Sequence, residues 1–231
     1  MTEALRAGQA REVLVAEGSK QTEGLREVLE AAAAAGVEAQ EVPRERLDSL
    51  ADEHRGVVAV LRSMPATLAE RDIDTFVFGP EAIVVVLDGV TDPQNLGAAA
   101  RAADAAGAEM LVTRTHRSAG ITPAAVRASA GALLALPHAR VANLPRALDR
   151  LKELGFTVAG LDASAPGSIL EQPRPEGRLA LVVGSEGSGM ARLTREHCDL
   201  LVSLPMRGRV ASMNAAASLA ATLYGWALRR S

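Results

Sequence analysis

The stretch AIVVVLDGVTDPQNLGAAARAADAAG, residues 82–107, decides the fold class. Residues 82–89 form a predicted strand whose branched apolar run is typical of a central strand buried on both faces of a sheet. A polar loop, TDPQN, follows this strand, and an alanine-rich helix is predicted over residues 96–107. A buried strand that leads through a short loop into a helix indicates an α/β fold with a largely parallel sheet.

Short apolar runs alternate with helix-like stretches on both sides of this segment. Before it, we expect a helix at residues 22–35 and strands at residues 12–16, 37–42 and 56–61. After it, we expect strands at residues 109–113, 156–161, 178–184 and 200–204 and helices at residues 123–132, 145–154 and 212–229. The periodicity breaks around Pro65. The sequence therefore predicts a small N-terminal domain over residues 1–66, a linker over residues 67–81 and a main domain over residues 82–231.

The composition is that of an ordinary globular protein. The chain has 231 residues, 48% of them hydrophobic, and it lacks the apolar run of about eighteen residues that a membrane span needs. Its first residues carry charges where a signal peptide needs an apolar core, so we expect a cytoplasmic protein with no membrane partner. The single Cys198 cannot form an internal disulfide. Together with His197 it makes no metal-ligand spacing, so we expect no metal site.

Charge is divided unevenly along the chain. Residues 1–87 hold 9 Lys/Arg and 16 Asp/Glu, a net charge of −7, whereas residues 88–231 hold 16 and 12, a net charge of +4. Charge alone leaves two interpretations open, a basic surface for RNA on the second half or ordinary solvated faces. Aromatic residues make up only 2% of the chain, which argues against nucleic-acid binding by stacking platforms. A nucleic-acid partner would therefore be bound by arginine.

Three segments of the second half follow predicted strands, at the sheet edge where α/β proteins bind ligands. They are DGVTDPQNLG at residues 88–97 with Arg101 beyond it, LVVGSEGSGM at residues 181–190 and LPMRGRVASMN at residues 204–214. Each also has an ordinary explanation: Asn95 as a helix cap, a glycine-rich turn, and Ser212 or Asn214 as a helix cap. The glycine loop lacks the dinucleotide-binding fingerprint, which argues against the rival enzyme class, a dinucleotide-dependent oxidoreductase.

In their order and spacing these segments resemble the SpoU/TrmH family of RNA ribose 2'-O-methyltransferases, within the SPOUT superfamily. The first resembles the family's asparagine, glycine and arginine motif at Asn95, Gly97 and Arg101. The second resembles its G-x-E-x-x-G loop at Gly184, Glu186 and Gly189. The third resembles its I-P-M-x-G-x-x-x-S-L-N pattern at Leu204, Pro205, Met206, Gly208, Ser212, Met213 and Asn214. The N-terminal stretch MTEALRAGQAREVLVAEG resembles the substrate-binding domain of the branch that modifies guanosine in 23S ribosomal RNA.

The resemblance implies a parallel α/β sheet with a C-terminal deep trefoil knot, the α/β knot, and a small N-terminal α/β domain similar to ribosomal protein L30e. It also implies a homodimer formed through the knotted domain. The implied reaction is methylation of a ribose 2'-hydroxyl in structured RNA, with 23S ribosomal RNA as the expected partner and S-adenosylmethionine as the cofactor. The alternatives are a transfer RNA ribose methyltransferase and a non-catalytic RNA-binding or assembly member of the family.

The resemblance assigns the cofactor-binding and the catalytic residues. Cofactor binding falls to Gly184, Leu204, Met206, Gly208 and Met213. The catalytic set is Arg101, Asn95, Glu186, Ser212 and Asn214. The local excess of arginine, and not a family motif, leads us to expect phosphate contacts from Arg114, Arg117, Arg127, Arg207 and Arg209. Arg101 acts either as the base that deprotonates the ribose hydroxyl or as a lasting cation that stabilises the alkoxide. The chain departs from the family at Ala216, where a serine is usual, so we expect a retuned substrate contact there.

Overall fold

The computed structural model of the chain describes residues 1–51, 54–209 and 212–227. They belong to two compact units, Met1–Pro65 and Ala66–Ser231. The predicted linker, residues 67–81, contains strand β4 (Leu68–Ala69) and the 3-10 turn η1 (Glu70–Ile73). Because β4 pairs with a strand of the second unit, this stretch is part of the sheet of that unit.

The first unit is a three-stranded sheet covered on both faces by helices. Its strands are β1 (Ala10–Ala16), β2 (Ala39–Val42) and β3 (Val57–Leu61), and its helices are α1 (Thr2–Arg6), α2 (Glu23–Ala34) and α3 (Arg44–Asp48). β1 lies in the centre, parallel to β2 and antiparallel to β3. Val13 and Leu25 share a core with α1 and α2, while Leu14 packs against Leu47 of α3 on the other face. Because successive side chains of β1 point to opposite faces of the sheet, this strand contributes to two small cores.

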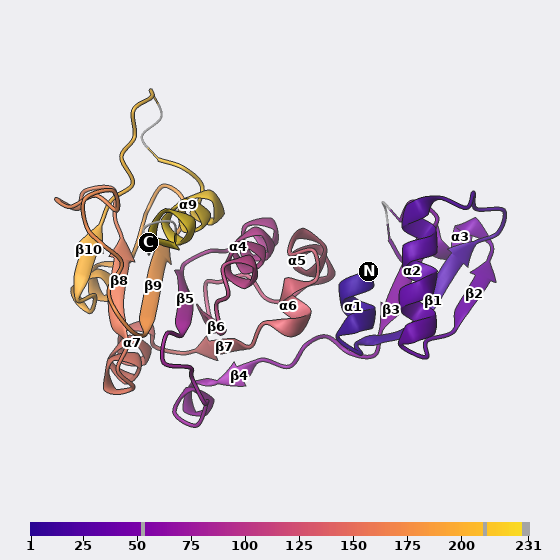
Figure 1. Cartoon of the computed structure of the whole chain (residues 1–231), viewed down its shortest axis with the longest axis horizontal. Coiled ribbons are helices and arrows are strands. Elements are labelled where there is room, and N and C mark those ends of the chain that lie inside the picture. Colours follow the sequence, from indigo (N-terminus) through magenta and orange to yellow (C-terminus); the bar gives the residue numbers. More distant parts are fainter. Residues whose placement is uncertain (52–53, 210–211, 228–231) are drawn as a thin grey trace. The chain divides into compact units, whose positions relative to one another are not determined.

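The second unit is built on a seven-stranded sheet in which all pairs are parallel. Its strands besides β4 are β5 (Ile83–Asp88), β6 (Met110–Arg114), β7 (His138–Val141), β8 (Thr157–Leu161), β9 (Leu179–Gly184) and β10 (Leu200–Val202). Their order is β10-β8-β9-β5-β6-β7-β4, which can be followed from left to right in Figure 1. The parallel sheet predicted from the apolar run of residues 82–89 is confirmed, and that run forms a central strand, β5.

Helices cover both faces of this sheet. They are α4 (Pro93–Ala105), α5 (Pro123–Ala128), α6 (Ala132–Ala135), α7 (Leu144–Glu153), α8 (Arg192–Glu196) and α9 (Ala215–Ala227). Leu96 of α4 and Leu219 of α9 pack into the core on one face, whereas Leu148 of α7 packs into the core on the other. Among the described residues, no helix combines the length and apolar character that a membrane crossing would require.

Two predicted helices of this unit differ from the observed ones, and one observed strand was not predicted. The helix predicted over residues 123–132 is two helices, α5 and α6, because Ala130 and Gly131 both take positive φ values between them. Strand β7 was not predicted, since its short sequence HARV has no continuous apolar run. The predicted helix at residues 212–229 begins at Ala215, and its last two residues lie outside the described residues.

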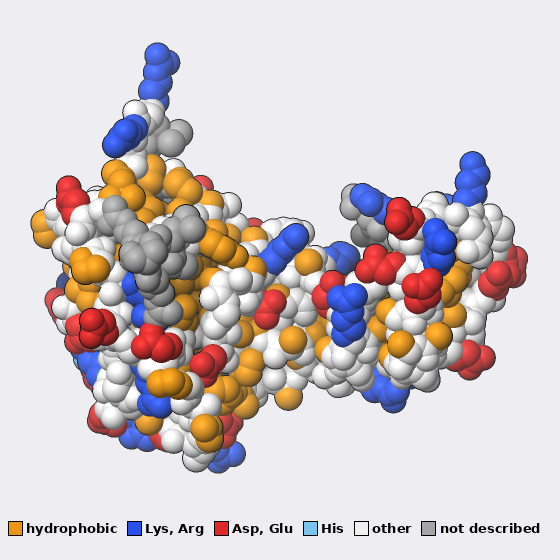
Figure 2. All heavy atoms as spheres, viewed as in Figure 1, with side chains coloured by type: hydrophobic (Ala, Val, Ile, Leu, Met, Phe, Trp, Pro, Cys, Tyr) orange, Lys and Arg blue, Asp and Glu red, His pale blue; other side chains and the backbone are white. Residues whose placement is uncertain are grey.

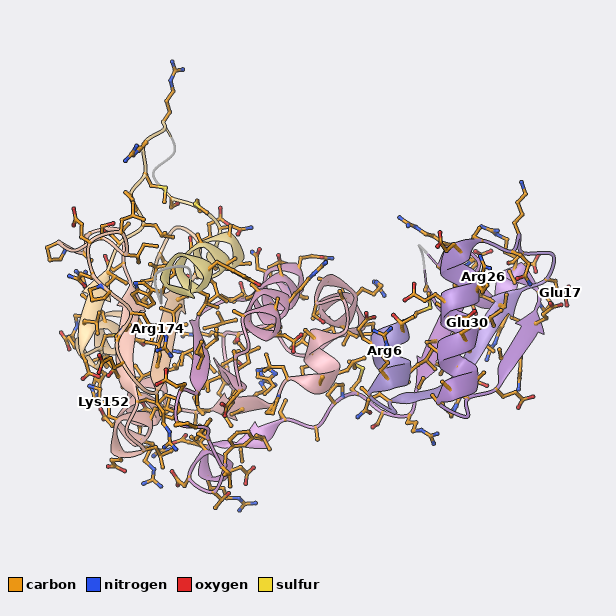
Figure 3. All side chains as sticks on the ribbon, in the orientation of Figure 1. Arg6, Glu17, Arg26, Glu30, Lys152 and Arg174 are labelled. Carbon is orange, nitrogen blue, oxygen red and sulfur yellow. The ribbon has the colours of Figure 1, made fainter. Side chains whose placement is uncertain are left out.

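The long connection between β8 and β9 is tied to the C-terminal part of the chain. The backbone N–H of Ile169 donates to Ser203 beyond β10, and the Ser203 N–H donates to Gly167. The indole Nε1 of Trp226 in α9 donates to the Gln172 carbonyl at 3.1 Å. Arg174, labelled in Figure 3, donates to the carbonyls of Pro175 and Gly177 within the same connection. The connection thus contacts both the exit of β10 and the last helix.

Candidate functional site

A cavity of about 160 Å³ opens at the carboxyl ends of β8, β9 and β10. Its lining consists of Leu161, Ala163, Val183, Gly184, Ser185, Glu186, Gly187, Gly189, Leu204, Met206, Ser212, Met213, Ala215 and Ser218. The carboxyl edge of a parallel sheet is the usual ligand site of α/β proteins. The second and third sequence segments therefore meet at one cavity, although thirteen residues separate them along the chain.

The glycine loop after β9 forms one wall of the cavity. Ser185 and Gly189 exchange two backbone hydrogen bonds of 3.1 and 2.9 Å, which close the loop into a tight turn. Gly187 and Gly189 have φ values of 82° and 66°, in the region that favours glycine. A Cβ on Gly184 would lie 2.1 Å from the Gly189 carbonyl carbon, so only glycine fits there. By contrast, a Cβ on Gly187 or Gly189 would meet nothing within 4 Å, which leaves their backbone open to a ligand.

The third segment reaches the cavity from the opposite side. Leu204, Met206 and Met213, assigned to the cofactor, line it together with Ser212 of the catalytic set, but Gly208, also assigned to the cofactor, does not. Between β10 and α9 this segment projects from the body of its unit, and Figure 2 shows Lys or Arg side chains at its tip. The segment therefore combines a cavity wall at its ends with a charged tip.

Asn214 ends this segment as the cap of α9. Its Oδ1 accepts a hydrogen bond of 2.7 Å from the Ala217 N–H, which satisfies a donor in the first turn of the helix. Ala216 is 6% exposed and packs in the core, so the position where the family often has serine faces the protein interior. Two residues later, Ser218 lines the cavity and its hydroxyl donates to the Met213 carbonyl at 3.4 Å.

Asn95, Gly97 and Arg101 of the first segment lie on α4, outside the lining of the cavity. Asp92 caps this helix by accepting from the N–H groups of Gln94 and Asn95, so the alternative interpretation of Asn95 as the cap is wrong. The side chain of Asn95 is half-buried and that of Arg101 is exposed. The side chain of Arg101 has no hydrogen bond or ion pair to another described residue. Of the predicted catalytic set, the structure brings Glu186 and Ser212 together at the cavity.

The five arginines predicted to contact phosphate fall into two groups. Arg117, Arg127, Arg207 and Arg209 are exposed, and none of them pairs with an acidic residue in the described part of the chain. Arg114 is different, because its Nε lies 3.0 Å from Oδ1 of the buried Asp88. Its side chain is 28% exposed. Four of the five therefore present free cations to solvent, and the fifth is engaged inside the molecule.

The titratable groups with strongly shifted pKa values lie outside the cavity lining. Burial, with a contribution from the Arg140 cation, lowers the pKa of His138 to about 4, and its Nε2 lies 2.8 Å from the Thr113 hydroxyl. Burial raises the pKa of Cys198 to about 12, so its thiol stays protonated and is a poor nucleophile. No group of three or more described His, Cys, Asp or Glu side chains is arranged to hold a metal ion.

The cavity wall is suited to binding and offers little acid–base chemistry of its own. Leu161, Leu204, Met206 and Met213 provide apolar surface, three serine hydroxyls provide hydrogen bonds, and Glu186 is the one carboxylate in the lining. A ligand with apolar and polar parts fits such a wall. A reaction at this site must therefore draw its reactive group from the ligand.

Several lining residues were not predicted from the sequence. Leu161 and Ala163 follow a predicted strand at the same sheet edge, so the strand pattern itself contained a signal for them. Ser218 lies one helical turn beyond Asn214 and was hidden in an alanine-rich helix. The lining role of Ser185 and Gly187 follows only from the turn geometry of the glycine loop.

Family models match both units of the chain. The model of the SpoU rRNA Methylase family matches residues 82–224. A model described as RNA 2'-O ribose methyltransferase substrate binding matches residues 1–65. Together they account for most of the sequence, and their limits fall close to the division between the two compact units.

Curated relatives are similar over nearly the whole chain. The 23S rRNA (guanosine-2'-O-)-methyltransferase RlmB of Ralstonia nicotianae is 39% identical over 217 residues, covering 93% of this chain and 86% of that protein. RlmB of Haemophilus influenzae is 40% identical over 217 residues, covering 92% and 87%. The crystal structure of the SpoU methyltransferase AviRb from Streptomyces viridochromogenes, in complex with AdoMet, superposes with a TM-score of 0.79 at 28% identity. That match covers 99% of this chain and 87% of AviRb.

Proposed function

The chain belongs to the SpoU rRNA methylase family, and we propose on that premise that it transfers a methyl group from S-adenosylmethionine to a ribose 2'-hydroxyl of 23S ribosomal RNA. One observation carries the proposal. The glycine loop and the 204–214 segment, which follow different strands, line a single cavity at the sheet edge. The relatives that match over nearly their whole length are named 23S rRNA (guanosine-2'-O-)-methyltransferases, and this supports 23S ribosomal RNA as the substrate.

The lining of the cavity suits the chemistry of S-adenosylmethionine. Open backbone at Gly187 and Gly189 allows close approach of a ligand, and Leu204, Met206 and Met213 offer an apolar surface for a purine ring. We propose that these residues hold the cofactor with Gly184, and that Gly208 completes the site from the segment between Met206 and Ser212. When bound, the cofactor supplies an electrophilic methyl group, and the protein provides position and charge.

We propose that Arg101 acts on the ribose hydroxyl. When the ribose hydroxyl attacks a methyl group its proton passes to solvent water, and a guanidinium beside the oxygen stabilises the negative charge that develops there. Since Arg101 has no acidic partner among the described residues, its charge is free for RNA. Glu186 and Ser212 at the cavity would orient the nucleotide. Asn214 and Asn95 would do so with their amide N–H₂ groups, which make no described hydrogen bonds.

RNA is proposed to contact both units. Arg117 lies in the loop between β6 and α5, Arg127 lies in α5, and Arg207 and Arg209 belong to the projecting segment. All four are exposed, as phosphate contact requires. The match of residues 1–65 to a substrate-binding model supports an RNA-binding role for the first unit. Its β-sheet flanked by helices on both faces is compatible with a domain similar to ribosomal protein L30e. Action on ribosomal RNA also favours a cytoplasmic protein.

A deep trefoil knot is proposed for the C-terminal part. The connection between β8 and β9 is hydrogen-bonded to Ser203 on one side and to Trp226 on the other. Such contacts are expected if the last segment passes through this connection. A homodimer through the same domain is also proposed. Small side chains along α9 and the exposed Tyr224 suit close packing against a second copy.

Methyl transfer from tritiated S-adenosylmethionine tests the proposed function. The purified chain is incubated with protein-free 23S ribosomal RNA, with bulk transfer RNA and with neither, and labelled ribose is identified after alkaline hydrolysis, to which 2'-O-methylated linkages are resistant. We expect label in ribosomal RNA only. Label in transfer RNA alone would mean that transfer RNA, and not 23S ribosomal RNA, is the substrate. Cofactor binding without label in either RNA would favour a non-catalytic RNA-binding role.

A further inference from the structure

Asp88 is a buried carboxylate behind the glycine loop. It is the last residue of β5 and is only 3% exposed. Its Oδ2 accepts a hydrogen bond of 2.8 Å from the backbone N–H of Ala191. Its Oδ1 lies 3.0 Å from Nε of Arg114, at the end of the neighbouring strand β6. The Nε–H of Arg114 makes no hydrogen bond to a described residue, so this contact is an ion pair held by charge.

Asp88 contacts both ends of the loop, by backbone strand pairing at one end and by its side chain at the other. In the parallel register of β5 and β9, Asp88 lies opposite Gly184, where the loop begins. Ala191, which its carboxylate holds, lies just after the loop. Five of the residues that line the cavity come from this loop: Gly184, Ser185, Glu186, Gly187 and Gly189. A shift of Ala191 would therefore move one whole wall of the cavity.

Arg114 compensates the buried charge and is itself fixed by neighbours. Its Nη2 donates to the hydroxyl of Thr194, a fully buried residue of α8, at 3.4 Å. Its backbone carbonyl and that of Thr115 accept from Nη2 of Arg140, at 3.5 and 2.8 Å. Removal of one partner of a buried ion pair leaves the other charge uncompensated, which is strongly unfavourable. Asp88 and Arg114 therefore act as a unit.

We infer that Asp88 and Arg114 are positioning residues of the cofactor site. Their ion pair fixes the 184–191 loop against the ends of β5 and β6. Arg114 therefore stabilises one wall of the cavity and does not contact RNA phosphate. The inference rests on the proposed function for the identity of the ligand. It differs from the expectation, drawn from the locally basic sequence, that Arg114 contacts RNA phosphate.

The test compares the single variants Asp88→Asn and Arg114→Gln with the double variant. Calorimetry measures the affinity for S-adenosylhomocysteine, and hydrogen exchange measures protection of the Ala191 amide in the ligand-free protein. Arg146→Gln is the matched control, since Arg146 pairs with Glu70 on the exposed side of α7, away from the cavity. We expect each single variant to bind the cofactor product about tenfold or more weakly and to lose protection at Ala191. The control should match the wild type.

The double variant and RNA binding separate positioning from simple destabilisation. Because both charges are absent, the double variant should lose less affinity than the sum of the single losses. Arg114→Gln should leave the salt dependence of RNA binding unchanged, as a phosphate contact would not. Unchanged cofactor affinity in folded single variants, or a reduced salt slope for Arg114→Gln, would overturn the inference. If the wild type itself binds no cofactor product, the proposed function fails, and the Ala191 amide alone decides whether the pair holds the loop.

Discussion

Gly97 in α4 lies so close to Ala125 in α5 that a Cβ on Gly97 would be 2.4 Å from the Ala125 carbonyl oxygen. The same atom would lie 2.5 Å from the Cβ of Ala128. The glycine that the family resemblance marks between Asn95 and Arg101 thus has a packing reason. It lets two helices approach with their backbones in contact, and this fixes the helix that carries Arg101.

Gly97→Ala should therefore destabilise the second unit by roughly 1–3 kcal/mol through overpacking. Fluorescence of Trp226, the only tryptophan and a buried residue of this unit, reports its unfolding in urea. Gly120→Ala is the matched control, because a Cβ there meets nothing within 4 Å and its φ is not positive. Equal stability of the two variants would contradict the packing argument.

Gly184→Ala should abolish measurable cofactor binding, because its Cβ would overlap the Gly189 carbonyl carbon and force the loop open. Calorimetry with S-adenosylhomocysteine measures this effect, again with Gly120→Ala as the control. Wild-type affinity in a folded Gly184→Ala protein would show that the loop does not form the cofactor wall.

Arg101→Ala should keep cofactor affinity and lose methyl transfer, since Arg101 lies on an exposed face of α4 and outside the cavity lining. Removing a group that stabilises charge in the transition state costs about 100-fold or more in kcat. The measurement pairs calorimetry with the tritium assay. Turnover close to that of the wild type would remove Arg101 from the chemistry.

Replacement of Arg117 and Arg127 together by glutamine should flatten the salt dependence of RNA binding. Each phosphate contact contributes a slope of about 0.7–0.9 in log affinity against log salt, so the double variant should lose roughly 1.5. Filter binding at several salt concentrations measures the slope. The double variant Arg146→Gln, Arg150→Gln is the matched control, because both arginines already pair with Glu70 and Asp74. An unchanged slope would count against an RNA surface at Arg117 and Arg127.

His138 makes stability depend on pH. Burial, and then the Arg140 cation, lower its pKa from 6.5 to about 4 in the folded protein. Between these two pKa values, His138 binds a proton more readily in the unfolded chain than in the folded protein. The free energy of unfolding therefore falls as the pH drops from 6.5 towards 4. Between about pH 7 and pH 5 the His138 contribution to this loss is on the order of 2 kcal/mol.

His138→Gln removes this titration and keeps a polar partner for Thr113. Urea unfolding at both pH values should then show a smaller loss of stability than in the wild type. His116→Gln, at an exposed site, is the control and should retain the wild-type difference. Equal pH dependence of His138→Gln and the wild type would mean that His138 titrates normally.

Buried parallel strands were the most predictable part of the fold. β5 and β9 show continuous apolar runs because both of their faces are covered, and their predicted limits agree with the observed ones within a residue or so. β7 escaped prediction because His138 and Arg140 occupy positions on one of its faces. Their burial depends on Thr113 and on the carbonyls of the preceding loop, which are distant in sequence.

The site was predictable to the extent that local motifs build it. The glycine loop and the 204–214 segment carry their own turn and cap signals, and both reach the cavity. The partner of Arg114 was not predictable, since Asp88 lies 26 residues earlier and meets it only because β5 and β6 are neighbours. An arginine in a basic stretch gives no local sign that its charge is already paired.

The strand order of the second unit has a consequence for synthesis on the ribosome. β9 lies between β8 and β5, so a nascent chain that ends before residue 179 presents both of these strands with an unpaired edge. Every residue that lines the cavity follows residue 160, whereas the first unit is complete by Pro65. The first unit can fold while the second is still being made, but the sheet and the cavity close only near the end of translation. Until then, the exposed edges of β5 and β8 are the part of the molecule most in need of protection from aggregation.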